Sequence, residues 1–215
     1  MTLESLYPFL HAGKADVNGV LSDVARSTRD KLTEIAKLRD EVLAADGERI
    51  AVCATAVAQR FARGGRMITF GNGGSSTDAE ALATLFCAPR SADRPLPAMS
   101  LTSDVATLTA LANDVGFELV FARPIAAAGR ECDIAVGLST SGGSANVLRG
   151  FAQAHDKGML TVGFAGYSGG AMAEAAERGE IDFLFVMPSA SVHRIQEAQT
   201  TTYHVLAELT QRALQ

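Results

Sequence analysis

Two clusters of glycine and serine are the parts of this chain best suited to chemistry. Residues 71–78 read GNGGSSTD, and residues 139–144 read STSGGS. Glycine lets a backbone approach a ligand closely, and serine and threonine hydroxyls donate hydrogen bonds. If a helix begins at each cluster, its free N–H groups and the positive end of its dipole favour a phosphate. The clusters therefore predict a site for a phosphorylated ligand, although tight turns use the same residues for backbone geometry alone.

Neither cluster matches a nucleotide-binding motif. No lysine follows the glycines as a P-loop requires, and Ser76 stands where a dinucleotide fingerprint has its third glycine. A third glycine turn, at 168–170, has fewer hydroxyls and is interpreted as structural. Asn113 and Asp114 are a further polar pair after an apolar helical stretch over 105–112, with a helix end and turn as the alternative interpretation.

Five short apolar runs would hold these clusters in place. They lack a helical period and begin roughly 23–36 residues apart, which is too far for hairpins. Consecutive apolar positions fit strands that are covered on both faces. The pattern predicts a three-layer α/β fold with a five-stranded parallel sheet, whose strands cover 67–70, 98–101, 134–138, 160–164 and 183–186. Both clusters then follow the carboxyl ends of strands, where such sheets bind ligands.

Helical segments flank this core. Apolar residues three or four apart predict a long amphipathic helix over 16–45 and, after a break at Gly47, a second helix over 48–63. A closing helix is expected over 192–214. The length of 215 residues fits one domain, with 1–65 as a helical N-terminal region and 66–215 as the core.

Composition excludes several classes of partner. Lys and Arg number 19 against 24 Asp and Glu, a net charge of −5, so no overall basic field attracts nucleic acid or an anionic membrane. Three cysteines without paired spacing suit a reducing compartment. The first residues lack the basic start of a signal peptide, and no apolar run approaches the ~18 residues of a membrane span. We expect a cytoplasmic protein that contacts neither membrane nor nucleic acid directly.

The two clusters, together with the sequence RIQE at 194–197, resemble the sugar isomerase (SIS) domain and, more narrowly, the phosphoheptose isomerase family. The three motifs occur in the family's order, and the resemblance extends from about the second helix to the C-terminus. It implies a flavodoxin-like SIS fold and isomerisation of sedoheptulose 7-phosphate. It also implies a phosphorylated sugar as ligand and a homo-oligomer, commonly a tetramer, joined through helices.

The resemblance also implies site residues. By position, substrate contacts fall on Asn72, Gly73, Gly74, Asn113, Asp114, Ser139, Thr140, Ser141, Ser144 and Gln196, with 139–144 holding the phosphate. Gln196 and His204 match zinc ligands of the family, and His204 matches a residue that takes part in proton transfer. On a helix these two side chains lie about 80° and two turns apart, so they could face one cavity.

Two side chains of the family pattern are absent. The family carries a zinc-binding His and, four residues later, a Glu that is both metal ligand and catalytic base, whereas this chain has Ala81 and Leu85. Moving a proton between adjacent carbons needs a base at the carbon and an acid or metal at the oxygens. Two remaining ligands on one helix hold zinc poorly, because zinc usually has three or four protein ligands.

Nearby polar residues are weak substitutes. Asp78 is expected in the first turn of its helix, where a carboxylate complements the dipole. Glu80 is turned about 100° from Ala81 and is expected to lie outside the pocket. His193 shares nearly the same helix face as His204, so it is either a second imidazole or an exposed residue at the helix start.

Three functions fit these observations to different degrees. The first is a sugar-phosphate isomerase in which other groups replace the missing ones. The second is a binding module, a sensor or adaptor that holds a phosphorylated sugar without converting it. The third, a nucleotide-binding Rossmann protein, is disfavoured by the incomplete fingerprint. Ala81 and Leu85 favour reduced or altered catalysis, whereas the family resemblance favours a phosphoheptose isomerase.

Overall fold

The computed structural model describes residues 17–89 and 93–215, and five of its strands form one sheet in the order β2-β1-β3-β4-β5. All neighbouring strands are parallel. The strands are β1 (Met67–Gly71), β2 (Ala98–Ser100), β3 (Ile134–Ser139), β4 (Leu160–Gly166) and β5 (Phe183–Met187). The predicted sheet is confirmed, and each strand begins at its predicted residue.

The three central strands are the most apolar and are buried at every position. Their amino ends are aligned, because Met67 pairs with Ile134, which pairs with Leu160. The chain moves outward in one direction from β1 to β2 and in the other from β3 to β5. The order therefore reverses between β1 and β3, and ligands of doubly wound sheets bind in the crevice at that point.

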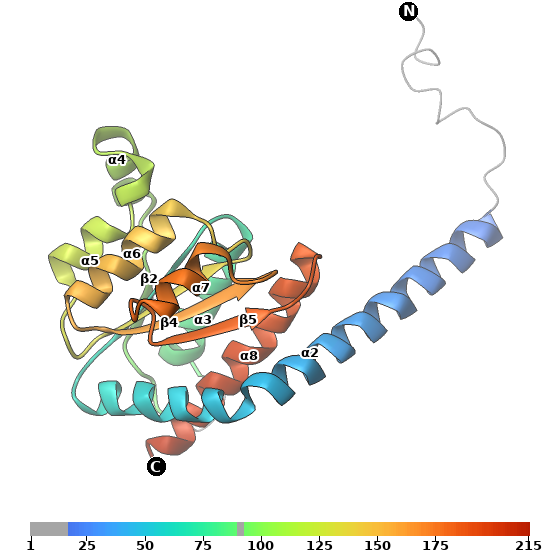
Figure 1. Cartoon of the computed structure of the whole chain (residues 1–215), viewed down its shortest axis with the longest axis horizontal. Helices are drawn as coiled ribbons and strands as arrows, with labels where there is room; N and C mark the ends of the chain where they lie inside the picture. Colours follow the sequence, from blue (N-terminus) through green and yellow to red (C-terminus); the bar gives the residue numbers. More distant parts are fainter. Residues whose placement is uncertain (1–16, 90–92) are drawn as a thin grey trace, which may run out of the picture. The chain divides into compact units, whose positions relative to one another are not determined.

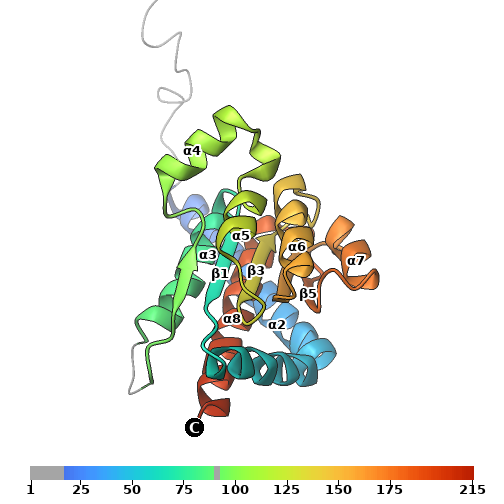
Figure 2. The ribbon, with the colours of Figure 1, turned by 90° about the vertical axis from the view of Figure 1, so that its left-hand side faces the viewer.

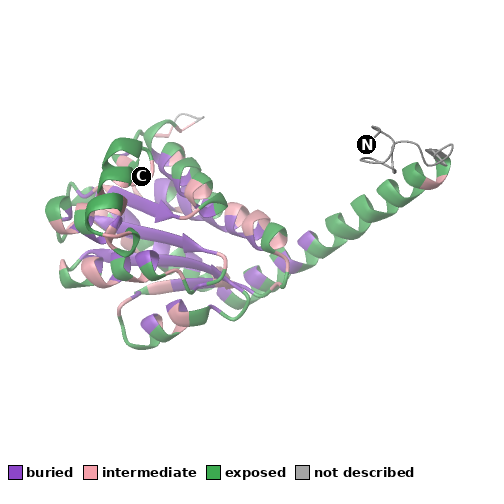
Figure 3. Cartoon of the chain, turned by 90° about the horizontal axis from the view of Figure 1, so that it is seen from above, coloured by how far each residue is buried: buried purple, intermediate pink, exposed green. Residues whose placement is uncertain are grey.

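Helices cover both faces of the sheet (Figures 1 and 2). One face carries α3 (Gly74–Cys87) and α8 (Val192–Ala213), which contact each other. The other carries α5 (Ala122–Ala128), α6 (Ala145–Asp156) and α7 (Gly170–Glu177), and α6 contacts both of its neighbours. Figure 3 shows the buried sheet between helices whose outer sides are exposed. The predicted three-layer arrangement is confirmed.

Aromatic contacts anchor the helices that border the crevice. On one face the ring of Phe70 in β1 packs against Phe151 of α6 and against Phe121, with centroid distances of 5.3 Å and 5.4 Å. On the other face Tyr203 of α8 packs edge-on against Phe164 of β4 at 6.5 Å. Both α6 and α8 are thus held to the sheet by large buried side chains.

One helix replaces the two that were predicted at the N-terminal side. Helix α2 runs over Val17–Ala62 without a break at Gly47. The prediction of a break was wrong because a glycine inside a helix costs only about 1 kcal/mol relative to alanine, and strong helix formers surround it. The closing helix was predicted well, since α8 covers Val192–Ala213.

Contacts within the chain separate Met1–Lys37 from Leu38–Gln215. Of the first unit, residues 17–37 are described and are helical, with exposed apolar side chains at Val20, Leu21, Val24 and Leu32. In the second unit, the Arg49 side chain of α2 lies 5.6 Å from the ring centroid of Phe185 in β5.

The expectation that no signal peptide is present concerns residues outside the described ones. No helix over residues 17–89 and 93–215 is long and apolar enough to cross a membrane.

Candidate functional site

Residues 139–144, which begin at the last residue of β3, bring three of their four side-chain hydroxyls close together, and we call this segment the serine loop. Ser139 Oγ lies 3.1 Å from Ser144 Oγ and 3.4 Å from Ser141 Oγ. Helix α6 begins directly afterwards, and the side chain of its cap residue, Ser144, makes no capping hydrogen bond. The loop therefore presents several hydroxyls beside the start of a helix, the arrangement that suits a phosphate.

A close backbone contact holds the serine loop in place. Gly142 has a φ of +64°, and a Cβ added there would lie only 1.9 Å from the carbonyl oxygen of Gly169. The N–H of Met172 also donates to the Gly142 carbonyl at 2.9 Å. Gly142 cannot be replaced without moving the neighbouring turn. The third glycine turn, at 168–170, thus supports the serine loop.

The first glycine cluster forms a turn into α3. Ser75 and Ser76 donate backbone hydrogen bonds to the carbonyls of Asn72 and Gly73, each at 3.0 Å. Gly73 has a φ of +55°, and the position where its side chain would stand is open space. The Asn72 amide exchanges two hydrogen bonds of 2.8 Å with the amide of Asn146 in α6. This pair joins the glycine cluster to the helix that follows the serine loop.

Helix α8 closes the other side of the glycine cluster. A Cβ added at Gly74 would lie 2.5 Å from Gln196 Nε2, so the amide packs directly on the glycine backbone. The same Nε2 donates to Asp78 Oδ2 at 3.1 Å. Asp78 Oδ1 accepts weaker contacts from the hydroxyls of Thr200 at 3.5 Å and Tyr203 at 3.4 Å. We call Asp78, Gln196, Thr200 and Tyr203 the acid cluster.

Burial changes the protonation of the acid cluster. It raises the pKa of the Asp78 carboxyl above its ordinary value, and the hydrogen bonds from Gln196, Tyr203 and Thr200 only partly oppose this. Burial also raises the pKa of the Tyr203 hydroxyl, and the neighbouring carboxylate adds to the effect. The prediction that Asp78 lies in the first helical turn was wrong. Helix α3 begins already at Gly74, which places Asp78 in its second turn, in contact with α8.

His204 does not join this cluster. Its side chain is exposed, and its ring stacks on that of Tyr203 with centroids 5.4 Å apart. Tyr203 lies seven positions after Gln196, about 20° away around the helix, whereas His204 is about 80° away. The side chain that shares a face with Gln196 is therefore Tyr203. His193 and Glu80 are both exposed.

Asn113 and Asp114 lie apart from the two loops in the hydrogen-bond network. Both are exposed at the end of α4 (Val105–Asp114), and the Asn113 amide donates to the Asp114 carboxylate at 2.8 Å. Helix α4 buries none of its residues and contacts the short helix η2 (Phe117–Leu119). Within the described chain, no hydrogen bond connects this pair to the serine loop or to the glycine cluster. Thr140, in the serine loop, is half-buried.

Sequence reasoning missed three polar residues of the site. Thr200 and Tyr203 follow Gln196 by four and seven positions, a spacing that places all three on one helix face and could have revealed them. Asn146 carried no such signal, because its partner, Asn72, is 74 positions away in the sequence.

Comparison with known proteins finds a SIS domain match and several relatives described as phosphoheptose isomerases. Residues 32–166 match the family model described as SIS domain. The phosphoheptose isomerase of Roseiflexus sp. is 37% identical over 199 residues, 92% of this chain and 98% of that protein. The phosphoheptose isomerase of Aquifex aeolicus is 42% identical over 163 residues, 75% of this chain and 83% of that protein. The structure of a phosphoheptose isomerase from Francisella tularensis matches with a TM-score of 0.81 at 32% identity, covering 88% of this chain and 98% of that chain.

The residues present do not fit a zinc ion of the kind that the resemblance implies. Ala81 is exposed and Leu85 half-exposed on α3, and neither offers a donor atom. The Gln196 amide donates a hydrogen bond to Asp78, and the exposed His204 ring stacks on Tyr203 without joining the hydrogen bonds of the acid cluster. In the described part of the chain, no group of three or more His, Cys, Asp or Glu side chains is placed to hold a metal.

We expect Asp78→Asn to change how stability depends on pH. Because the folded pKa of Asp78 is raised above 3.8, the folded state holds this proton more tightly than the unfolded state. The resulting stabilisation is present below pH 3.8 and is lost as the pH rises through the raised pKa. As the pH rises from about 4 to about 7, the free energy of unfolding should therefore fall more in the parent than in the variant. Urea titrations measure this difference.

Glu80→Gln is the matched control, since it neutralises an exposed carboxylate of the same helix. We expect it to leave the pH dependence unchanged. If the free energy of unfolding of both variants had the same pH dependence as that of the parent, the raised pKa of Asp78 would be contradicted.

Proposed function

The chain belongs to the SIS-domain family and, within it, to the phosphoheptose isomerase family, and on this premise we propose that it binds a phosphorylated sugar at the carboxyl edge of its sheet. The observation that carries the proposal is that the hydroxyls of Ser141 and Ser144 both lie within 3.4 Å of the Ser139 hydroxyl at the start of α6. Hydroxyls and helix N–H groups bind a phosphate without a basic side chain, so the net charge of −5 is no obstacle.

The sugar would lie next to the phosphate, across the crevice between β1 and β3. The open backbone of Gly73 leaves room for a ligand to approach, and the amides of Asn72 and Gln196 border the same turn. Amide groups both donate and accept hydrogen bonds, which matches the hydroxyls of a sugar. Asn146 and Asp78 would act on the ligand indirectly, by holding Asn72 and Gln196 in place.

We expect the double variant Ser139→Ala and Ser141→Ala to bind sedoheptulose 7-phosphate or a hexose phosphate at least about tenfold more weakly. Each lost hydrogen bond to a charged phosphate corresponds to about 1.5–3 kcal/mol, and 1.4 kcal/mol is a factor of ten in Kd. Titration calorimetry measures the change. Thr55→Ala, which removes an exposed hydroxyl from α2, should leave Kd unchanged. An absence of binding by the parent protein to every sugar phosphate tried would refute the proposal.

We propose further that the bound sugar is not isomerised through a zinc-dependent step. Ala81 and Leu85 leave the site without the ligand and base that the family uses, and the acid cluster occupies the face where Gln196 would meet a metal. Binding without turnover is the chemistry of a sensor or an adaptor. Asp78 is the carboxyl group that contacts Gln196, but its own hydrogen bonds hold it against α8.

We expect the double variant Ala81→His and Leu85→Glu to acquire stoichiometric zinc, while the parent protein purifies with little. Ala81 is exposed and Leu85 is only partly buried, so the new side chains fit without disturbing the core. Elemental analysis of protein purified without chelators measures the metal. Ala81→Gln with Leu85→Gln is the control, because it makes the same positions polar without adding an imidazole or a carboxylate. Stoichiometric zinc in the parent, or isomerase turnover that His204→Ala abolishes, would show that the site is intact.

We propose that the chain forms a homo-oligomer through α2 and α8. A groove of about 160 Å³ between these helices is lined mainly by apolar side chains, including Val42, Leu43 and Val205. Leu43 is 65% exposed. Arg39 and Asp40, also on the groove, carry opposite charges, so a two-fold contact would pair each with the other residue of a second copy.

Leu43→Glu should dissociate this oligomer, because it places a charge in an apolar contact. Multi-angle light scattering should then report the mass of a single chain, whereas the parent reports a multiple. Val105→Glu is the control, since Val105 is 64% exposed on α4, away from the groove. A single-chain mass for the parent protein, or an unchanged mass for Leu43→Glu, would argue against the groove as the contact.

A further inference from the structure

A second polar site lies at the amino edge of the sheet, opposite the loops described above. A pocket of about 360 Å³ is lined by Arg60, Arg63, Arg130, Glu131 and Cys132. Arg60 and Arg63 come from the end of α2 and the turn after it, and the other three residues directly precede β3. We call this the arginine pocket. No part of it belongs to the serine loop, the glycine cluster or the acid cluster.

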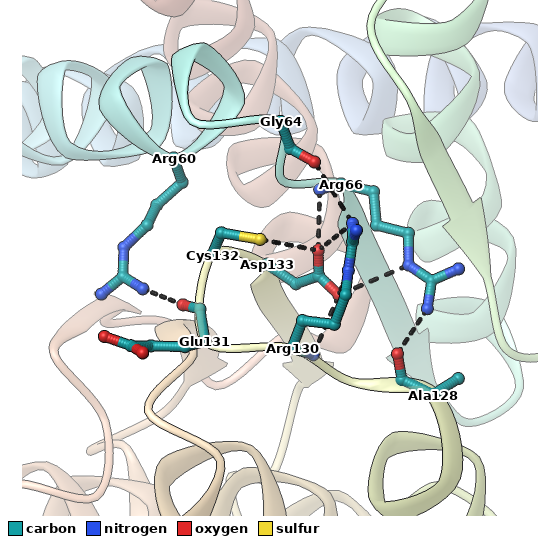
Figure 4. A network of polar contacts seen from close by, with 8 residues as sticks. All are labelled: Arg60, Gly64, Arg66, Ala128, Arg130, Glu131, Cys132 and Asp133. Carbon is teal, nitrogen blue, oxygen red and sulfur yellow. Dashed lines mark hydrogen bonds and ion pairs between the residues drawn. The ribbon is translucent and has the colours of Figure 1, made fainter.

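A buried carboxylate organises the wall of the arginine pocket (Figure 4). Asp133 is fully buried and accepts hydrogen bonds from the backbone N–H groups of Arg66 at 3.0 Å and Arg130 at 3.1 Å. The guanidinium of Arg130 donates to the same carboxylate at 2.9 Å and to the Gly64 carbonyl at 3.2 Å. Arg130 is thus held in one orientation at the rim of the pocket.

The hydrogen bonds donated to the Asp133 side chain keep its carboxyl group ionised. Burial by itself would raise the pKa of this carboxyl, but the hydrogen bonds from Arg130 and from the backbone of Arg66 and Arg130 outweigh it and hold the pKa below its usual range. Asp133 therefore carries its charge at neutral pH and is shared by two arginines, Arg66 and Arg130.

The other two arginines of the pocket have no carboxylate partner. Arg60 donates to the backbone carbonyls of Glu131 and, at 3.0 Å, of Gly158, and these carbonyls carry no net charge. Across the residues that the structure describes, neither Arg60 nor Arg63 forms an ion pair. Three guanidinium groups and one carboxylate, that of Glu131, thus line the pocket. This concentration of positive charge stands out in a chain with a net charge of −5.

We propose that the arginine pocket binds a small phosphate-bearing anion, at a site separate from the one that binds the sugar phosphate. Guanidinium groups are planar forks of N–H donors that match the oxygens of a phosphate, and they remain charged at every physiological pH. The volume of about 360 Å³ is sufficient for a phosphate or diphosphate with a small organic group. Arg130 is positioned for such a ligand by Asp133, and Arg63 provides an uncompensated charge.

Cys132 offers a direct readout, since its half-buried thiol lines the pocket. Iodoacetamide is uncharged, so its reaction with this thiol reports access to the pocket, and mass spectrometry resolves each cysteine. Cys87 is exposed and lies outside the pocket, so it is an internal control. At a pyrophosphate concentration roughly ten times its Kd, the alkylation rate of Cys132 should fall about tenfold while that of Cys87 stays constant.

Arg63→Gln should weaken this protection at least about tenfold in apparent Kd, because it removes a charged donor from an exposed position. Arg149→Gln, which removes an exposed arginine of α6 outside the pocket, should leave it intact. Protection is compared with and without pyrophosphate within each variant, so a changed intrinsic reactivity of the thiol does not affect the result.

Two further arms define the ligand and separate the two sites. Inorganic phosphate and sedoheptulose 7-phosphate, tested in place of pyrophosphate, distinguish a free from an esterified phosphate. In the variant Ser139→Ala and Ser141→Ala, protection of Cys132 should persist even though sugar-phosphate binding at the serine loop is weakened. The proposal is overturned if chloride at equal ionic strength protects Cys132 as well, if no phosphate compound protects it, or if Arg63→Gln leaves the protection unchanged.

Discussion

The loops that follow β3 and β4 touch through their backbones, the glycine cluster after β1 packs against the Gln196 side chain, and the site depends on these close contacts. A single methyl group at Gly142 would overlap the carbonyl of Gly169, and one at Gly74 would overlap the amide of Gln196. Glycine at position 142 allows the serine loop to approach the turn at 168–170, and glycine at position 74 allows the glycine cluster to approach α8. The parallel register of the central strands brings the loops to the same edge, and the glycines allow them to meet there.

The same closeness joins α3, which carries Ala81 and Leu85, to α8, which carries Gln196. The two helices are connected by hydrogen bonds from Gln196, Thr200 and Tyr203 to Asp78. Such a cluster orients the Gln196 amide, but it supplies no Lewis acid and keeps its carboxyl partly buried. Under the proposed function, this arrangement would hold a phosphorylated sugar without the zinc ligand and base of the family, whose positions are Ala81 and Leu85 in this chain.

The two proposed sites, at opposite edges of the sheet, would attract anions by different physical means. At the carboxyl edge the donors are hydroxyls and the start of α6, which are neutral groups made effective by their orientation. At the amino edge full charges act, held in place by the buried carboxylate of Asp133. Because neither mechanism depends on the overall charge of the protein, the net charge of −5 says little about the ligands. Local geometry would determine which anion each edge binds.

The sequence by itself determined the strands, their parallel arrangement and the two loops, because apolar runs, turn residues and helical periods are local patterns. Even so, the helix break expected at Gly47 and the position expected for Asp78 were wrong, since a helix tolerates one glycine and can begin earlier than its apolar spacing suggests. Only the tertiary structure decided which side chains meet. How helices and strands pack determines that Asn72 pairs with Asn146 and that Asp78 pairs with Tyr203. It also places Arg66 and Arg130 beside the buried Asp133. Contacts between residues distant in the chain leave no periodic signal, because burial and orientation are set by the whole fold.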